Sequence, residues 1–281
     1  EGFKSGGFAA ATNTGNAFVT PLNALYQPES AEGFELGIKA LLLDGSLRTN
    51  LTLYDYDYTN LQVNSLDNSS GVPVIRVNNA GAAAVRGVEA DFIFRPEAIE
   101  DLTIRGAVNY SDATYTDFLA TCWIGQTIAE GCNQLVNPTT LRFTGQQLAG
   151  HRLINAPEWS GSIGAGYVHS TGMPGISWGL NADANYKSDY NPHPELHPGA
   201  EQESVWFLNA GARVFSDDRR WEFALIGRNL TEEFRVDVAS NVPGTGTAAR
   251  TGSATLGGQA DLTGNVNRGR EIMFQLTFRP F

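Results

Sequence analysis

The chain has 281 residues, with 30 acidic and 19 basic side chains and a formal net charge of -11, which excludes the basic footprint that nucleic-acid binding needs. Glycine is abundant at 31 residues and aromatic residues make up 10% of the chain, a composition typical of many strands joined by many turns. No stretch of 18 or more apolar residues occurs, which excludes a transmembrane helix but not a spanning β-strand, since such a strand needs only about 9–11 residues with every second one apolar.

Nine segments alternate apolar and polar residues with a period of two, which is the pattern of strands. In the clearest, residues 176–187, Ile, Trp, Leu, Ala, Ala and Tyr share one face, and Ser, Gly, Asn, Asp, Asn and Lys share the other. A helix would mix these two sets. In chain order, we predict strands over residues 34–40, 51–58, 88–94, 102–111, 159–167, 176–187, 206–214, 221–228 and 272–279, preceded by a short strand within residues 1–8.

The second of the nine segments departs from this pattern. Leu51 and Leu53 lie on one face, after which Tyr54, Tyr56 and Tyr58 take over the other. A β-bulge near Leu53 would return the tyrosines to the face of the leucines, because one extra residue reverses the alternation. We therefore expect an irregular strand here.

The connections between the predicted strands alternate between short and long. Short ones fall at Asp44-Gly45, a tight hairpin signal, and at residues 96–101, 170–175 and 216–220, whereas long ones cover residues 9–33, 118–155, 188–203 and 230–268, and the one at 65–71 is intermediate. In an up-and-down meander, alternate connections lie at the same end, so one end should carry tight turns and the other large loops. Loops beyond about 12–15 residues are uncommon in compact domains, and this asymmetry is typical of outer-membrane barrels, with short periplasmic turns and longer extracellular loops.

Aromatic residues gather near the predicted strand ends, where amphipathic rings would meet lipid headgroups in a membrane barrel. The candidates for these girdles are Tyr54, Tyr56, Tyr58, Tyr110, Tyr115, Trp159, Tyr167, Trp206 and Trp221. The alternative is a soluble β-sandwich, which also alternates but buries its rings between two sheets. Because the polar faces carry many small neutral groups and the loops are long, we predict an all-β, antiparallel, up-and-down transmembrane β-barrel.

The chain contains two cysteines, Cys122 and Cys132, separated by nine residues in a stretch rich in Gly, Asn and Gln. With no histidine nearby, they fall short of the four ligands of a structural zinc site. We expect a disulfide that closes one loop in an oxidising compartment. The alternative is two unrelated free thiols.

Catalysis and metal binding find little support in the sequence. The segment His193-Pro194-Glu195-Leu196-His197 differs from the zinc motif H-E-x-x-H, because a proline follows the first histidine and the glutamate is displaced. Prolines at positions 192, 194 and 198 oppose a helix. We expect a solvent-exposed loop there, and we predict no catalytic residue, no metal site, no cofactor and no enzymatic activity.

Ligand contacts are expected in the long loops, because loops on a rigid scaffold carry binding functions disproportionately. Trp123, Tyr190 and Arg250 are the candidate contact residues, with an ordinary loop role as the alternative for each. Charged residues of the polar faces would line the barrel interior and meet a plug, with solvation and cross-strand pairing as alternative roles. They are Glu89, Asp91, Arg105, Asp183, Lys187, Arg213 and Arg228.

Short motifs spread over nearly the whole chain resemble the C-terminal half of the barrel of TonB-dependent receptors. No single motif is strong, but their order is specific. The motifs are Gly2-Phe3-Lys4-Ser5-Gly6-Gly7-Phe8, Pro28-Glu29, Glu35-Leu36-Gly37-Ile38-Lys39, Val77-Asn78-Asn79-Ala80-Gly81, Arg86-Gly87-Val88-Glu89, Asn155-Ala156-Pro157-Glu158-Trp159 and Gly227-Arg228-Asn229-Leu230-Thr231-Glu232-Glu233.

The resemblance implies a receptor in the outer membrane of a Gram-negative bacterium that imports a siderophore-iron complex, cobalamin or a carbohydrate with energy coupled through TonB. Barrels of this class have about 22 strands around a plugged lumen, so residues 1–281 would form only the C-terminal portion of the barrel, with the plug domain absent. The implied partners are outer-membrane lipid, the N-terminal plug, TonB through that plug, the barrel assembly machinery and a small-molecule ligand such as an iron chelate. The alternative is a passive porin-like or adhesive outer-membrane barrel without a plug.

The resemblance also implies an assembly signal in the last strand, where the lipid-facing set commonly ends with an aromatic residue. Phe274, Leu276 and Phe278 are in phase, whereas Phe281 follows Pro280 and falls on the opposite face. A strand end tolerates Pro280, which cannot donate a ladder hydrogen bond. We expect the three in-phase residues, together with Phe281, to form this signal.

Overall fold

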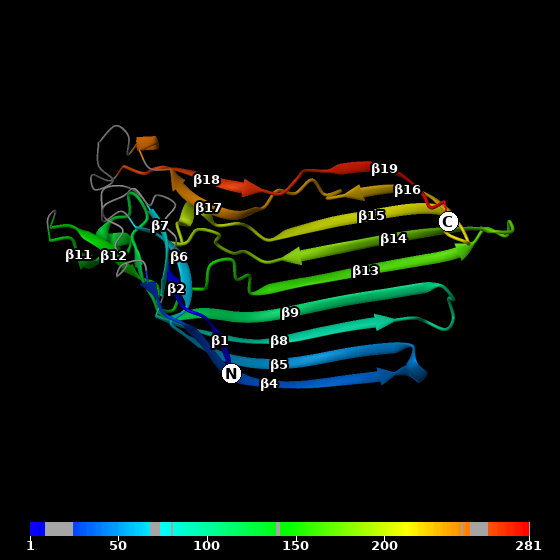
Figure 1. Ribbon diagram of the computed structural model, residues 1–281, viewed down its shortest axis with the longest axis horizontal. Coiled ribbons are helices and arrows are strands. Elements are labelled where there is room, and N and C mark those ends of the chain that lie inside the picture. The colour runs from blue at the N-terminus through cyan, green and yellow to red at the C-terminus, as the bar shows by residue number, and fades with distance from the viewer. Residues whose placement is uncertain are drawn as a thin grey trace.

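The computed structural model describes residues 1–8, 25–67, 74–79, 81–138, 141–242, 244–247 and 258–280. Its main element is a ten-stranded antiparallel sheet in which strands pair in chain order (Figure 1). In sheet order, the strands are β1 (Gly2–Lys4), β4 (Glu29–Leu42), β5 (Leu47–Thr59), β8 (Ala82–Phe94), β9 (Leu102–Asp117), β13 (Trp159–Ser170), β14 (Ile176–Lys187), β15 (Val205–Ser216), β16 (Trp221–Arg228) and β19 (Glu271–Phe278). The predicted all-β, antiparallel, up-and-down arrangement is confirmed.

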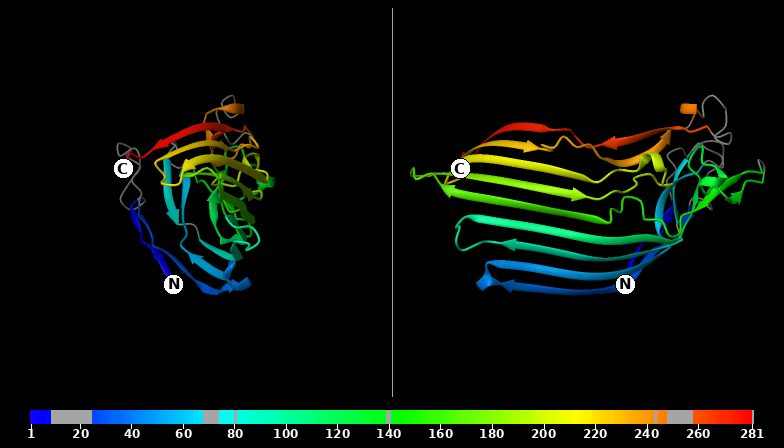
Figure 2. Two further views of the ribbon diagram at one scale, coloured as in Figure 1. Left: turned by 90° about the vertical axis from the view of Figure 1, so that its right-hand side faces the viewer. Right: turned by 180° about the vertical axis from the view of Figure 1, so that it is seen from behind.

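The sheet curves into an open arc when it is seen along its strands (Figure 2). β1 and β19 are its two edges, so these strands form part of a barrel wall that does not close on itself. Short turns join the strands at one end, including η1 (Leu43–Gly45), where Asp44 and Gly45 both have positive φ. We call this end the turn end and the opposite end the loop end.

The long connections at the loop end carry small sheets of their own (Figure 1). These pair β2 (Gly7–Phe8) with β3 (Leu25–Tyr26), β6 (Gln62–Asp67) with β7 (Val74–Asn79), β12 (Phe143–Gln147) with both β10 (Leu119–Thr121) and β11 (Gln134–Val136), and β17 (Val236–Val242) with β18 (Asp261–Val266). Two short 3-10 turns, η2 (Ile128–Glu130) and η3 (Pro198–Ala200), complete the loops. Among the described helical segments, none is both long enough and apolar enough to cross a membrane.

The main sheet has two chemically different faces, because paired residues on adjacent strands point the same way. Leu53 pairs with Leu36 on one side and with Val88 on the other, which defines what we call the outer face. Large apolar side chains dominate this face and are open to the surroundings: Phe34, Leu36, Ile38, Leu51, Leu53, Val108, Ile163, Leu180, Leu208, Val214, Phe223, Leu225, Ile272, Phe274, Leu276 and Phe278. No described element packs against these side chains, so the sandwich alternative is wrong.

Aromatic rings form two bands on the outer face. The band at the loop end consists of Tyr110, Trp159, Tyr186 and Trp206, and the band at the turn end consists of Tyr167, Trp178 and Trp221. Trp159 and Tyr167 lie eight residues apart on β13, which corresponds to about 26 Å along a strand. Because strands of an outer-membrane barrel tilt by about 35–45°, this interval corresponds to about 20 Å of height, which fits within an apolar belt of about 25 Å.

β5 is regular, so the expected bulge near Leu53 is wrong. Its pairing with both neighbouring strands continues without a shift through all 13 residues. Tyr54, Tyr56 and Tyr58 therefore lie on the face opposite the leucines, which we call the inner face, and not in an outer girdle. There the Tyr54 hydroxyl donates a hydrogen bond to Asn109 Oδ1 at 3.0 Å.

The alternation changes along β5 because both faces change character toward the loop end. Asp55 and Asp57 continue the outer face after Leu51 and Leu53. The Arg86 Nε–H on the same face donates to Asp55 Oδ1 at 3.0 Å. One face changes from apolar to charged residues, and the other changes from polar to aromatic residues. In the sequence, these two changes look the same as an extra residue that reverses the alternation.

A buried apolar cluster lies at the loop end, where β8 and β9 of the main sheet meet the loops. It consists of Ala83, Tyr115, Phe118, Ala120 and Leu148, all at most 6% exposed. Tyr115 is 1% exposed and packs on Phe118 with ring centroids 4.8 Å apart, so its expected place in an outer girdle is also wrong. The loops at this end therefore pack together like a small domain. We call this apolar cluster, together with the described parts of the loops around it, the loop cluster.

Candidate functional site

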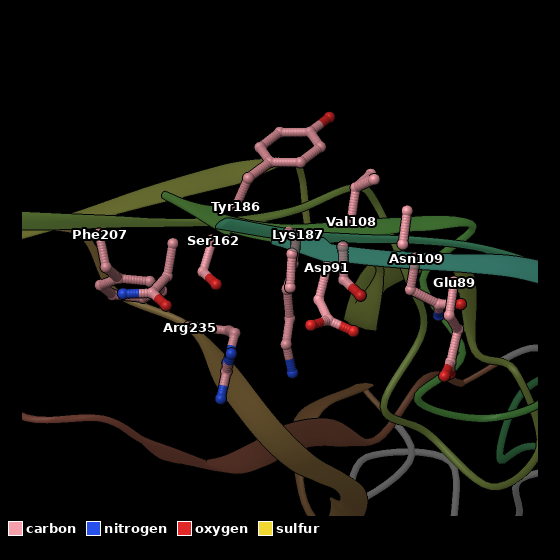
Figure 3. Close-up of a pocket in the computed structure, with 14 residues that line it drawn as sticks. Glu89, Asp91, Val108, Asn109, Ser162, Tyr186, Lys187, Phe207 and Arg235 are labelled. Atoms are coloured by element: carbon pink, nitrogen blue, oxygen red, sulfur yellow. The ribbon is translucent and has the colours of Figure 1, made fainter. Parts of the chain in front are cut away.

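The inner face contains a hollow of about 420 Å³ close to the loop end (Figure 3). Its floor is low because β13 contributes the small residues Ser160 and Ser162. Lys187 of β14 stands on one side of this floor, and Glu89 of β8 stands on the other. Figure 3 shows both charged side chains below the sheet, whereas Tyr186 points to the opposite side.

The strand register places the charged ends of the hollow in one transverse row. Glu89 pairs with Asn109, Asn109 pairs with Ser160, and Ser160 pairs with Lys187. The four side chains therefore share the inner face. The Asn109 amide and the Ser160 hydroxyl lie between Glu89 at the acidic end and Lys187 at the basic end.

The basic end of the hollow has a second cation, Arg235, from the segment that leads into β17 (Figure 3). Its Nη2 lies 2.7 Å from Asp237 Oδ1, and its Cζ lies 5.8 Å from the centre of the Phe207 ring. The Nε of Arg235 is buried without a hydrogen-bond partner among the described residues. The guanidinium thus has an unused donor beside Lys187.

The acidic end of the hollow is partly satisfied within the sheet. Asp91 accepts hydrogen bonds from Asn50 Nδ2 at 2.8 and 3.0 Å, and these two residues are paired across β5 and β8. Glu89 and Lys187 form no hydrogen bond or ion pair with any residue in the described ranges. Among the described residues, the hollow therefore has one charge of each sign without a direct hydrogen bond or ion pair, and Lys187 lies within the electrostatic influence of Arg235 and Asp237.

The register also fixes the other charged residues of the inner face. All seven charged residues expected to line the interior share the face of Glu89, which agrees with the alternation in their sequence. Asp183, below the hollow, accepts hydrogen bonds from Asn185 Nδ2 at 3.0 Å and from Asn209 Nδ2 at 2.8 Å. One hydrogen bond along β14 and one from β15 thus satisfy this carboxylate.

The loop cluster above the hollow contains a disulfide between Cys122 and Cys132. The bond closes a segment within the loop between β9 and β13. Within the same loop, the Thr127 backbone N–H donates to Glu130 Oε2 at 2.8 Å. This hydrogen bond lowers the pKa of the Glu130 carboxyl, with a further contribution from the Thr127 hydroxyl.

Trp123 and Tyr190, two candidate ligand contacts, lie inside the loop cluster. Each is only 4% exposed. The Trp123 ring packs on His197 with centroids 4.3 Å apart, and the Tyr190 hydroxyl donates to the Val236 carbonyl at 2.7 Å. Burial raises the pKa of Tyr190 to about 12. A ligand could touch either ring only after the loops had moved, and the third candidate, Arg250, lies outside the described residues.

The loop between β14 and β15 is joined to the loop between β9 and β13 by polar contacts. Gln146 Nε2 donates to the carbonyls of Thr121 and Glu195, both at 3.0 Å. Arg152 and Asp189 form an ion pair, and this hydrogen-bonded pairing lowers the pKa of Asp189. The loops are therefore joined by polar contacts as well as by apolar packing.

The expectation of a solvent-exposed loop at His193 to His197 is wrong. His193, Glu195 and His197 are 0%, 5% and 6% exposed. The sequence seemed polar and proline-rich, but burial is possible because the polar atoms pair locally: His193 Nδ1 lies 3.1 Å from Glu195 Oε2. Burial lowers the pKa of His197, and the electrostatic effect of the nearby His193 lowers it further.

The two histidines do not form a metal centre in this arrangement. The Gly199 N–H donates to His197 Nδ1 at 2.9 Å, so the neutral ring carries its proton on Nε2, where it cannot ligate a metal. No group of three or more His, Cys, Asp or Glu side chains in the described part of the chain could hold a metal ion. Both Nε2 atoms are buried without a protein partner.

The sequence pattern predicted some residues of the hollow and missed others. It placed Glu89, Asp91 and Lys187 on the interior face. It missed Phe207 and Arg235, because Arg235 reaches the hollow from a loop and lies 48 positions from Lys187. No periodic pattern links residues brought together in this way.

Comparisons with known proteins agree with this architecture. A family model described as "TonB dependent receptor-like, beta-barrel" matches residues 1–231. No curated protein matches the chain.

Several solved structures share the fold at low sequence identity. The chain is similar to the ferric yersiniabactin uptake receptor FyuA from Yersinia pestis, with 13% identity over 98% of this chain and 33% of that one, and a TM-score of 0.64. It is also similar to two proteins from Acinetobacter baumannii, the siderophore receptor PiuA (16% identity, 92% and 30% coverage, TM-score 0.59) and the ferric preacinetobactin receptor BauA (18% identity, 98% and 32% coverage, TM-score 0.55). The chain thus spans about a third of the length of these structures.

Proposed function

The chain belongs to the TonB-dependent receptor family through its β-barrel, and on that premise we propose that it forms part of an outer-membrane receptor that imports a scarce nutrient with energy coupled through TonB. The family is one of receptors and transporters and not of enzymes. The chemistry proposed here is accordingly binding and gating, with no bond made or broken.

The observation that carries this proposal is the contrast between the two faces of the sheet. The outer face exposes side chains such as Phe34 at 83% and Phe274 at 82%. In water, such a surface would cost about 25 cal/mol for each Å² of apolar area, whereas hydrocarbon accommodates it without cost. Outer-membrane lipid is therefore the proposed partner of this face, and the loop end is the proposed extracellular side.

The polar inner face supports a water-filled or plugged interior. Ten strands are fewer than the about 22 of energy-coupled transporters, and the solved receptors are about three times as long as this chain. We propose that these strands form the C-terminal portion of such a barrel. Its interior would hold an N-terminal plug, through which TonB acts.

The ligand class proposed is a siderophore-iron complex, ahead of cobalamin and carbohydrate. Its support is that the solved structures with this fold include a ferric yersiniabactin uptake receptor and a ferric preacinetobactin receptor. Capture would occur at the loop cluster and the hollow beneath it. In the last strand, Phe274, Leu276 and Phe278 lie on the outer face, and we propose them as the signal for the barrel assembly machinery; Phe281 lies outside the described residues.

The proposal is tested by deleting the gene in its host and measuring growth and uptake of radiolabelled iron on a panel of iron chelates. Loss of uptake of at least one chelate, restored by the wild-type gene and abolished again when TonB is inactivated, is the expected result. Uptake that persists without TonB would point to a passive barrel instead. Fractionation that recovers the protein away from the outer membrane would exclude both.

A further inference from the structure

The imidazole of His197 caps a short turn in the loop between β14 and β15. The turn is η3, and the Gly199 N–H near its start donates to His197 Nδ1 at 2.9 Å. A ring nitrogen that accepts a hydrogen bond carries no proton. The cap therefore exists only while the ring is neutral, because protonation places on Nδ1 an N–H that faces the N–H of Gly199.

The capped turn is connected to the β17–β18 hairpin through Gln202. The Gln202 Nε2–H donates to the carbonyl of Ala200, the last residue of η3, at 2.9 Å. Gln202 Oε1 accepts from the N–H of Val236, the first residue of β17, at 3.0 Å. Tyr190 forms a β-bridge with Gln202, and its hydroxyl donates to the Val236 carbonyl. We call His197, Gln202 and Tyr190 the latch, because they tie the hairpin to this loop.

The surroundings of the His197 ring oppose its protonation. The ring is buried against Trp123 of the loop between β9 and β13. The titratable groups that act on it are His193, with ring centroids 5.6 Å apart, Glu195 on the same loop, and Glu130 on the loop between β9 and β13. Both glutamates favour the charged ring, but burial and His193 outweigh them, so the pKa of His197 is lowered.

The packing around the cap comes from the described loops themselves. His193 is fully buried beside the ring. From the loop between β16 and β19, the apolar side chain of Leu262 borders Gly199 and offers no charge that could compensate an imidazolium. Segments outside the described ranges cannot reach the cap without displacing this packing. The dependence of the cap on a neutral ring is therefore a property of these three loops.

We propose that the latch is a proton-sensitive switch, in which protonation of His197 breaks the cap on η3, frees the Gln202 amide and releases the β17–β18 hairpin from the loop between β14 and β15. At neutral pH the latch is closed. The open latch binds a proton that the closed latch excludes, so acid shifts the equilibrium toward the open form. This control on the loop cluster is additional to the proposed function and does not depend on transport of a ligand.

Hydrogen exchange of the full-length protein in detergent micelles tests the switch. It is measured by mass spectrometry at about pH 7.5 and about pH 5, on either side of the ordinary histidine value of about 6.5. Protection factors remove the intrinsic effect of pH on exchange and report the opening equilibrium. The reporting amides are those of Val236 and of Ala239, whose N–H donates to the Pro192 carbonyl at 3.3 Å. Amides paired between β14 and β15 are the internal reference.

The variants separate the cap from the charge. His197→Asn and His197→Ser keep an oxygen that accepts the Gly199 N–H but never becomes cationic, since Asn and Ser are good N-cap residues. His197→Ala removes the acceptor. His151→Asn is the matched control, because His151 is an exposed histidine of the loop between β9 and β13.

The expected result is a pH effect that belongs to His197 alone. In the wild type and in His151→Asn, acid lowers the protection of the reporting amides about tenfold, the effect of losing an N-cap of ordinary strength, while the reference amides do not change. The two cap-retaining variants stay protected at both pH values, and His197→Ala is weakly protected at both. An acid-insensitive wild type, or a cap-retaining variant that loses protection in acid as the wild type does, overturns the inference. Neither TonB nor a ligand is present, so this failure is distinct from a failure of the transport proposal.

Discussion

Replacing both Cys122 and Cys132 by alanine is expected to loosen the loop cluster while leaving the main sheet intact. The disulfide closes a segment of 10 residues. A link across about 10 residues reduces the conformational entropy of the open loop. In the chain-entropy description, this reduction destabilises the open loop by about 2.7 kcal/mol. Because every 1.4 kcal/mol is a factor of ten, the opening equilibrium of this loop should rise about 100-fold.

Hydrogen exchange measured by mass spectrometry checks this prediction, since exchange of protected amides reports local opening. The reporting amides are those of the loop, where the Asn137 N–H donates to the Arg142 carbonyl at 2.8 Å. Amides paired between β13 and β14 serve as the internal control and should not change. Chemical reduction of the wild-type protein is a matched second route to the open loop and should reproduce the effect. Loop exchange within threefold of the oxidised wild type, by both routes, would refute the reasoning.

Three further predictions concern the loops, the outer face and the sheet. Because the pKa of His197 is lowered in the folded loops, its contribution to stability is fully present above the ordinary value of about 6.5 and is lost as the pH falls through the folded value; proteolysis of the loops should therefore accelerate on acidification in the wild type, and a His197→Phe variant should flatten that profile. Phe274→Arg on the outer face should destabilise the barrel in vesicles by about 2–4 kcal/mol in denaturant titrations, whereas Gln275→Arg on the inner face should cost under half as much. Gly87→Ala should reduce the yield of folded protein, because a Cβ there would lie 2.2 Å from the Tyr110 carbonyl; Gly166→Ala, whose Cβ meets nothing within 4 Å, should fold normally.

The strands were predictable because one physical rule, alternation between an apolar and a polar side, decides most of their residues. The segment 176–187 is reproduced to the residue as β14. The rule failed where a face changes environment along a single strand. Asp55 and Asp57 follow Leu51 and Leu53 on one face of β5, and no local pattern distinguishes such a change from a bulge.

The loop cluster was much less predictable, because its packing depends on contacts between distant segments. His193 and Glu195 are polar and lie among prolines, which favours exposure in any local reading. Their burial depends on Gln146, whose amide reaches the Glu195 carbonyl from 49 positions away. The position of Arg235 at the hollow was unpredictable for the same reason, because it also depends on contacts between distant segments.

If the chain forms part of the proposed outer-membrane receptor, the repeated spacing of the two aromatic bands has a consequence for capture of a solute. Trp159 and Tyr167 on β13, and Trp178 and Tyr186 on β14, keep the same eight-residue interval. A wall held at two depths by such rings can neither sink into the bilayer nor rise from it without moving indole and phenol groups out of the headgroup layers that suit them. In the proposed receptor, the height of the binding surface above the lipid would thereby be fixed, and only lateral diffusion and movement of the loops themselves would remain for meeting a solute.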